Sequence, residues 1–425
     1  MGGGGLAVYC TKCYEIASTD DIELNIQRDS RLEFKVSFDD EKEMKALFFF
    51  FPGCGMEMNE DYLEYLAEFV VKEFDVAMVR VNYHCIGNRP QMGAKFYLDT
   101  IDRLIISQVC QTLNINIPQD FFPNRDMNEN EMLFLFSYIS GELSKLKNLG
   151  VLKKEALLYF TATLEPTKNE YQNFGIMQAL DIINVLYYIK NNLPFKLSND
   201  YKTILSGSSH GAYLALLVTK IVPWLVDAVL ENSGYVNPSL RYIGFGKEID
   251  YQKLAELFDT RIEHIIIACS SKTHWTSNKS SQNHFSKAHA KIRSLLDEEH
   301  LKIMASYNKP KIISYHAQSD LDIAPASEKE RFHHYLHNLG FDSKLYMMSE
   351  KDVDGKLIKN AQGHGMDISF KAFLKKELPP LLINEFAIKA KKAKGITYLS
   401  ENLKYSFKEN AKGAGVELKL VRIEN

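Results

Sequence analysis

Hydrophobic and polar residues alternate near the start of the chain, and the apolar positions then become continuous. Alternation over Asp21–Ile26 and Leu32–Phe38 predicts two strands with one buried face each. Ala46–Phe51 is wholly apolar and is followed by Pro52 and Gly53, which is typical of a strand buried on both faces in a parallel sheet. The first part of the chain therefore predicts a sheet whose later strands are covered by other elements.

Strands and helices alternate from this point on. Helical spacing extends over Asn59–Lys72 and is clearest over Gly175–Lys190, which carries a single apolar stripe. The other predicted elements are strand Val76–Val81, strand Thr203–Ser206, helix His210–Ile221, strand Ala228–Asn232, strand Lys311–Tyr315, helix Ser327–Leu339, strand Lys344–Met348 and helix Ile368–Lys376. This order predicts an α/β fold with a twisted, mostly parallel sheet and helices on both faces.

Two long stretches interrupt the alternation, and we expect both to be mainly helical insertions because long structureless loops are uncommon in compact domains. The tail carries two strand-like runs, Leu403–Phe407 and Val416–Val421. The predicted organisation is a flexible start (1–14), N-terminal strands and the first part of the core (15–83), a cap-like insertion (84–171), core (172–233), a second insertion or lid (234–308), core (309–382) and a C-terminal extension (383–425).

Composition and charge exclude several classes of protein. The 425 residues carry a net charge of -3, so nucleic acid is not an expected partner. No apolar run is long enough to span a bilayer. Six cysteines are too sparse for a disulfide framework and predict free thiols in the cytoplasm. Neither the single Cys10-x-x-Cys13 pair nor His333 with His337 has enough further ligands for a metal site, so we expect no cofactor.

The strongest chemical signal is Gly207-Ser208-Ser209-His210-Gly211, which fits G-x-S-x-G with Ser209 at its centre. The pattern alone is weak, and a glycine- and serine-rich turn without chemistry is the alternative. Here the motif follows a predicted strand and opens a predicted helix, which is the setting of a nucleophile elbow. Small residues on both sides suit the tight turn that exposes the serine hydroxyl.

A nucleophilic serine needs a base, and in this type of fold the partners follow in the order serine, acid, histidine. His364, flanked by Gly363 and Gly365, lies in a loop after the last predicted strand and is the candidate base. The acid is expected just after Lys311–Tyr315, at Asp320 or Asp322. The segment resembles the His-Gly-x-x-Asp stretch of many hydrolases, and this resemblance favours Asp320. It would hold the histidine tautomer, and the other aspartate would cap the next helix.

An oxyanion hole requires two backbone N–H groups aimed at the developing negative charge. One donor should be His210, the residue after the nucleophile. The second should come from the loop after Ala46–Phe51, at Cys54 or Gly55, because Pro52 has no N–H.

These segments resemble the α/β-hydrolase superfamily from about Glu15 to Pro379, and they are most similar to its esterase and prolyl-oligopeptidase-like serine hydrolases. The resemblance rests on ILSGSSHGAYLA, ISYHAQSDLDIAP and NAQGHGMDIS. It implies an eight-stranded α/β-hydrolase sheet with Ser209, Asp320 and His364 as nucleophile, acid and base. Ala212 and Ala317 stand where that branch often has glycine.

The whole chain also resembles an uncharacterised Campylobacter family, catalogued as a domain of unknown function. NYHCIGNRPQMGAKFY, NEYQNFGIMQALDIINVLYYIKNN and SSKTHW carry this similarity. The resemblance implies a link to flagellin glycosylation.

We therefore expect a carboxylesterase or deacetylase that acts on a small acylated substrate, with an acylated carbohydrate as one candidate. Acyl transfer with the same three residues, peptide cleavage, and a non-catalytic glycan-binding protein on a hydrolase fold are the alternatives. Tyr171, Trp275 and Phe285 could line the substrate site or form the core of the insertions. The oligomeric state is left open.

Overall fold

The chain divides into two compact units in a computed structural model that describes residues 9–238, 240, 247, 258–383 and 394–423. The first unit takes in Met1–His84, Phe174–Pro238 and Lys287–Asn425, and the second takes in Cys85–Asn173 and Ser239–Ser286. Gly2–Gly5, expected to be a flexible start, lies outside the described residues.

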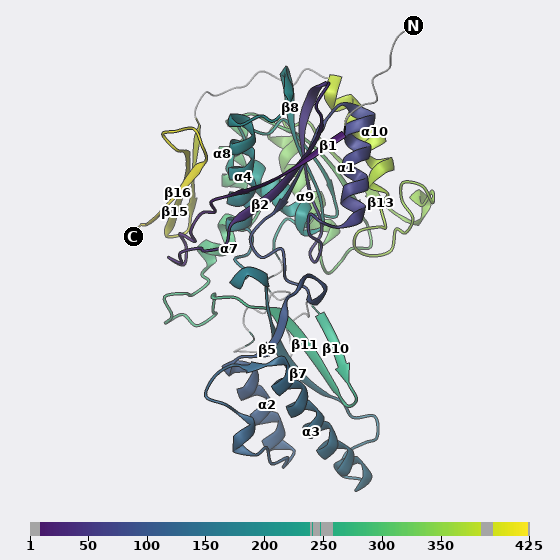
Figure 1. Cartoon of the computed structure of the whole chain (residues 1–425), viewed down its shortest axis with the longest axis vertical. Coiled ribbons are helices and arrows are strands. Elements are labelled where there is room, and N and C mark those ends of the chain that lie inside the picture. The colour runs from purple at the N-terminus through teal and green to yellow at the C-terminus, as the bar shows by residue number, and fades with distance from the viewer. Residues whose placement is uncertain (1–8, 239, 241–246, 248–257, 384–393, 424–425) are drawn as a thin grey trace. The chain divides into compact units, whose positions relative to one another are not determined.

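The first unit is built on an eight-stranded sheet with the order β1-β2-β4-β3-β8-β9-β12-β13 (Figure 1). Its strands are β1 (Tyr9–Ile16), β2 (Leu32–Asp39), β3 (Glu43–Phe51), β4 (Ala77–Asn82), β8 (Lys196–Ser208), β9 (Ala228–Asn232), β12 (Lys311–Ala317) and β13 (Ser343–Met348). β2 is antiparallel to both of its neighbours, whereas every pair from β4 to β13 is parallel. The predicted α/β fold, with its mostly parallel sheet, is confirmed.

Helices cover both faces of this sheet, as its apolar central strands require. On one face α1 (Asp61–Phe74) and α10 (Phe370–Ile383) pack together over a core that includes Phe48 and Phe50 of β3 (Figure 1). The helices of the other face are α4 (Ile176–Asn191), α5 (His210–Ile221) and α9 (Ala326–Asn338). All six residues of the predicted run Ala46–Phe51 are buried.

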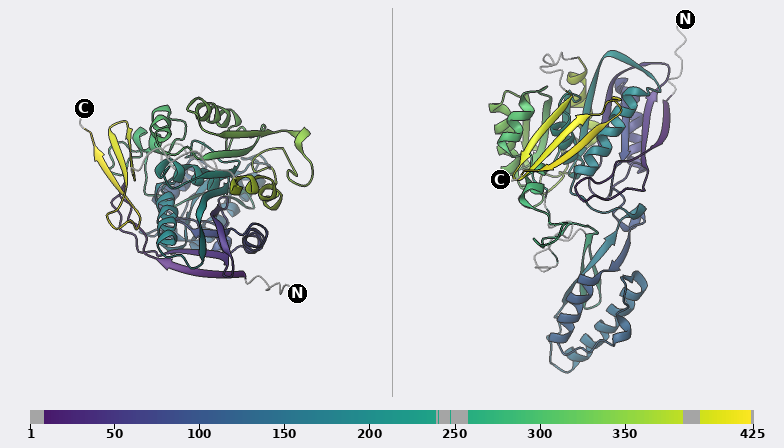
Figure 2. Two further views of the ribbon diagram at one scale, coloured as in Figure 1. Left: turned by 90° about the horizontal axis from the view of Figure 1, so that it is seen from above. Right: turned by 90° about the vertical axis from the view of Figure 1, so that its left-hand side faces the viewer.

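The C-terminal part of the first unit forms a separate antiparallel sheet (Figure 2). It consists of β14 (Gly395–Ser400), β15 (Leu403–Glu409) and β16 (Val416–Arg422). Two short helices, α7 (Lys287–Arg293) and α8 (Glu298–Ala305), contact β14. The two strand-like runs of the tail are therefore strands, and β14 is an additional one.

The second unit differs from the prediction of two mainly helical insertions. It contains a five-stranded sheet with the order β10-β11-β7-β5-β6, packed against α2 (Thr100–Thr112) and α3 (Glu129–Asn148). Its strands are β5 (Lys95–Leu98), β6 (Met127–Asn128), β7 (Leu158–Glu165), β10 (Phe258–Ile262) and β11 (Ile265–Ser271). β11 from the second predicted insertion pairs in parallel with β7 from the first, so the two insertions form one sheet.

Two further elements differ from expectation for local reasons. Asp21–Ile26 is a turn closed by backbone bonds between its ends, not a strand. The Asp21 carboxylate accepts N–H bonds from Glu23 and Leu24 at 3.0 and 3.1 Å, and such local bonding competes with strand pairing. β1 begins at Tyr9, within the segment expected to be flexible.

Among the helices in the described part of the chain, none is both long and apolar enough to cross a membrane. All six cysteines are present as free thiols.

Candidate active site

Ser209 lies in the turn between β8 and α5, at the carboxyl edge of the central sheet. Its φ of 53° is positive, which is strained for a non-glycine residue and typical of a nucleophile elbow. A Cβ on Gly207 would lie 2.4 Å from the carbonyl carbon of Gly211, and a Cβ on Gly211 would lie 2.1 Å from the carbonyl oxygen of Phe51. Both positions of the motif therefore require glycine.

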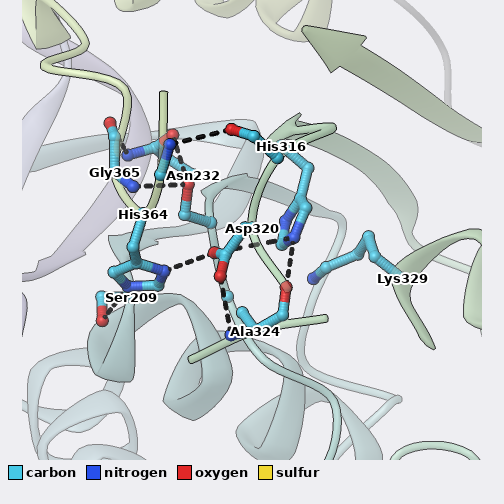
Figure 3. A network of polar contacts seen from close by, with 12 residues as sticks. Ser209, Asn232, His316, Asp320, Ala324, Lys329, His364 and Gly365 are labelled. Carbon is cyan, nitrogen blue, oxygen red and sulfur yellow. Dashed lines mark hydrogen bonds and ion pairs between the residues drawn. The ribbon is translucent and has the colours of Figure 1, made fainter. Parts of the chain in front are cut away.

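The structure brings together the three side chains that the sequence analysis selected (Figure 3). Ser209 Oγ donates to Nε2 of His364 at 2.7 Å, and Nδ1 of His364 donates to Oδ2 of Asp320 at 2.6 Å. The other carboxylate oxygen of Asp320 accepts the N–H of Ala324 at 3.1 Å. Because a carboxylate only accepts hydrogen bonds, this arrangement places the proton of neutral His364 on Nδ1 and leaves Nε2 as the acceptor.

The environment of Asp320 keeps its carboxyl group ionised. Burial alone would raise its pKa, but the hydrogen bonds from His364 and from the Ala324 N–H outweigh burial and hold the pKa below its usual value. Asp320 is 3% exposed, whereas the side chain of His364 keeps 17% of its surface. The acid is thus enclosed while the imidazole can still be reached.

The loop that carries His364 is fixed on both sides by hydroxyl and amide groups. Gly363 N–H donates to Ser319 Oγ at 2.8 Å, and Gly365 N–H donates to Ser233 Oγ at 3.2 Å. Asn232 Nδ2 donates to the carbonyl oxygen of Gly365 at 3.1 Å (Figure 3). The sequence analysis missed these residues, although Asn232 ends a predicted strand and Ser233 follows it at the edge where the site lies.

A buried polar cluster lies behind the acid. His316 Nε2 donates to the carbonyl oxygen of Ala324 at 2.7 Å and is 3.9 Å from Asp320 Oδ2 (Figure 3). Lys329 and Glu231 form a fully buried ion pair at 2.8 Å. Burial, helped by the charge of Lys329, lowers the pKa of His316 to about 4, so this imidazole is neutral near pH 7. The cluster encloses Asp320 without supplying a second base.

A second imidazole flanks Ser209 on the side of α5. Gln178 Oε1 is 3.0 Å from Nε2 of His210, and the hydroxyl of Tyr235 contacts Nδ1. Burial lowers the pKa of His210 to about 4 and keeps the ring neutral. With the Gln178 oxygen as acceptor, Nε2 carries the proton and Tyr235 donates to Nδ1.

The predicted oxyanion donors come from two segments next to Ser209. His210 is the first residue of α5, where backbone N–H groups have no acceptor inside the helix. A Cβ on Gly53 would lie 3.7 Å from the Cβ of Ser209, so the loop after β3 passes directly beside the nucleophile. The assignment of the two donors to His210 and to Cys54 or Gly55, which follow Gly53, stays a prediction.

Asp322 is the alternative candidate for the acid. Asp322 is exposed, and the carboxylate bound by His364 is that of Asp320. The expected helix cap by the second aspartate is not observed, because the N-cap of α9 is Pro325, without a side-chain bond.

Three aromatic residues predicted as possible substrate contacts are buried in the second unit. Tyr171 packs edge-on against His274 at 4.4 Å, and Trp275 packs edge-on against Phe285 at 5.3 Å. Their role as substrate contacts stays a prediction.

No group of three or more histidine, cysteine, aspartate or glutamate side chains in the described residues could hold a metal ion. His333 is buried, and its Nε2 lies 2.8 Å from the hydroxyl of Ser314.

Several solved structures are similar to this chain at low identity. An acylaminoacyl peptidase from Pyrococcus horikoshii is 12% identical with a TM-score of 0.43, over 90% of this chain and 43% of that one. The esterase Pf2001 from Pyrococcus furiosus is 11% identical with a TM-score of 0.40, over 86% and 92%, and the esterase Est22 is 9% identical with a TM-score of 0.40, over 84% and 73%. This chain thus spans less than half of the length of the peptidase.

A search among curated proteins finds no match. A family model described as "Protein of unknown function (DUF2920)" matches residues 12–420, which is nearly the whole sequence. The chain therefore belongs to the DUF2920 family.

Proposed function

We propose that this protein is a serine hydrolase that cleaves an ester through an acyl-enzyme formed on Ser209. The observation that carries the proposal is the unbroken hydrogen-bond path from Asp320 through His364 to the Ser209 hydroxyl. A strained elbow serine, an imidazole in the correct tautomer and an enclosed carboxylate together form a nucleophile, a base and an orienting acid.

In the first half of the reaction, Ser209 Oγ attacks the acyl carbonyl carbon while its proton passes to Nε2 of His364. Asp320 stabilises the imidazolium that forms. The negative oxygen accepts hydrogen bonds from the N–H of His210 and from an N–H of the loop after β3. When the carbon–oxygen bond to the leaving alcohol breaks, His364 returns its proton to that oxygen.

In the second half, a water molecule attacks the acyl-enzyme and gives its proton to His364. The bond to Ser209 then breaks, Ser209 regains the proton, and a carboxylic acid is released. The substrate class that we propose is a small carboxylic ester. An acetylated sugar is the first candidate, because the sequence resembles a family linked to flagellin glycosylation.

The deciding experiment compares Ser209→Ala with Ser206→Ala. Ser206 lies in the same strand, and its buried hydroxyl has no hydrogen-bond partner among the described residues, so its loss should leave the elbow intact. We expect Ser209→Ala to lose fluorophosphonate labelling and p-nitrophenyl acetate hydrolysis while circular dichroism stays unchanged. Ser206→Ala should keep both activities.

Two results would contradict the proposal. Hydrolysis that persists in Ser209→Ala would place the nucleophile elsewhere. A wild-type protein that neither reacts with the probe nor cleaves any of a panel of acylated sugars and simple esters would be a binding protein. Product analysis also separates hydrolysis, which releases free carboxylic acid, from transfer of the acyl group to a sugar hydroxyl.

A further inference from the structure

A cavity of about 420 Å³ in the first unit adjoins the nucleophile elbow on the face covered by α1 and α10. Its volume falls in the range of small-molecule sites. Ser208 and Gly53 form its wall towards the elbow, and Gly53 is in van der Waals reach of Ser209. A molecule in this cavity would therefore lie against the backbone on either side of the reacting hydroxyl.

The inner lining of the cavity is apolar and partly aromatic. Phe50, at the end of β3, packs edge-to-face against Phe370 with the ring centroids 4.9 Å apart. Met56 and Ile368 add aliphatic surface to the same lining, and the ring of Tyr62 lies 6.4 Å from Phe370. This interior suits a hydrocarbon or aryl group rather than a strongly hydrated one.

Two cations complete the lining. Lys359 and Lys371 both border the cavity and are exposed, and no aspartate or glutamate lines it. Within the described part of the chain, neither lysine forms an ion pair with a carboxylate, although many other lysines do. Lys371 Nζ instead lies 5.6 Å from the ring centroid of Phe69. The cavity thus combines an apolar interior with unneutralised positive charge.

We propose that this cavity binds an apolar group that ends in an anion, such as a carboxylate, and that the esters cleaved at Ser209 carry such a group. The second clause rests on the proposed function, whereas binding to the cavity can be tested without it. The lysine ammonium groups would attract the anion while the hydrocarbon part fills the interior.

The test measures binding of 4-phenylbutyrate and of its neutral analogue 4-phenylbutyramide to Ser209→Ala protein by calorimetry or ligand-observed NMR. Two exposed charge contacts should make the carboxylate bind about tenfold tighter than the amide at low salt, and added salt should reduce the difference. In the double variant Lys359→Ala/Lys371→Ala the ratio of the two affinities should fall close to one. Phenethyl phosphate, measured in parallel, shows whether a phosphate serves as well as a carboxylate.

Lys375→Ala is the matched control. Lys375 lies on the same helix, and its Nζ is 5.5 Å from the same Phe69 ring, but it does not border the cavity. We expect this variant to keep the wild-type ratio. Equal affinities for the acid and the amide in the wild-type sequence, or a ratio that the double variant leaves unchanged, would overturn the proposal.

A kinetic experiment links the cavity to the reaction, with 4-phenylbutyrate as a competitive inhibitor of p-nitrophenyl acetate hydrolysis. Selective binding without any esterase activity or fluorophosphonate labelling would refute the proposed function and keep the cavity assignment. Esterase activity that neither phenylbutyrate nor the lysine substitutions affect would support the proposed function and refute the role of the cavity in substrate binding.

Discussion

Two histidines adjoin Ser209, His364 through a hydrogen bond and His210 as the next residue in the chain, but their rings have opposite electrostatic surroundings. On one side His364 donates to the buried carboxylate of Asp320 and accepts from the serine hydroxyl. On the other side His210 is held between Gln178 and the hydroxyl of Tyr235. Only His364 has a negative partner that could stabilise a positive charge on the ring.

We infer from this difference that His364 is the base and that His210 is a positioning residue. A base must gain a proton during the reaction, so its protonated form needs stabilisation, which Asp320 provides. His210 has neutral partners, and burial lowers its pKa to about 4. A protonated His210 would be costly. Its ring is instead held at the start of α5, where we propose that its backbone N–H binds the developing negative charge. Proximity to the nucleophile alone therefore does not identify the base.

The largest effect should come from removing each ring in turn. We expect His364→Ala to lower kcat by about 10⁴-fold or more, since it removes proton transfer altogether. His210→Gln keeps the backbone N–H and should cost only about tenfold through looser positioning. Steady-state kinetics on p-nitrophenyl acetate decides between them. An equal loss of kcat in both variants would contradict the assignment of different roles to His364 and His210.

A smaller but still large effect should follow from Asp320→Asn. The amide no longer stabilises the imidazolium and can hold His364 in the wrong tautomer, so kcat should fall by about 10³- to 10⁴-fold. Asp322→Asn, two residues away and exposed, should stay within about twofold of the wild type. If Asp322→Asn were the inactive variant, the observed hydrogen bond to Asp320 would not be the catalytic one.

The sequence predicts the residues around His364 far better than the residues that hold His210. His364 lies between two glycines, Ser209 has a glycine two residues away on each side, and Asp320 follows a recognisable strand, so local pattern and chain order suffice. Tyr235 and Gln178 carry no such local mark, because their role depends on the distance to His210 after folding. The strand Ala228–Asn232 and the helix His210–Ile221 are observed with the predicted bounds.

In the second unit, the spacing of hydrophobic residues does not predict the strands. β7 and β11 are seven or eight residues long and pair with each other across about a hundred residues of sequence. Short apolar runs of this length fit a strand or part of a helix equally well. Their pairing partner lies in the other predicted insertion, so neither stretch alone indicates a shared sheet.

The smallest expected effect concerns stability rather than rate, and it tests whether His210 is buried as a neutral ring. Its pKa of about 4 in the folded protein lies below the ordinary value of 6.5, so the unfolded chain binds the extra proton first. The free energy of unfolding should therefore fall as the pH drops from about 6.5 towards 4. His210→Gln should remove up to one proton from this dependence, about 1.4 kcal/mol per pH unit.

Urea midpoints measured between pH 4 and 7 would show this as a shallower slope in His210→Gln. His337→Gln, which removes an exposed imidazole from α9, is the control for a histidine-to-glutamine substitution as such. An unchanged slope in His210→Gln would mean that this ring can take up a proton in the folded protein. The ring of His210 could then act as a base in place of His364, because burial would not keep it neutral.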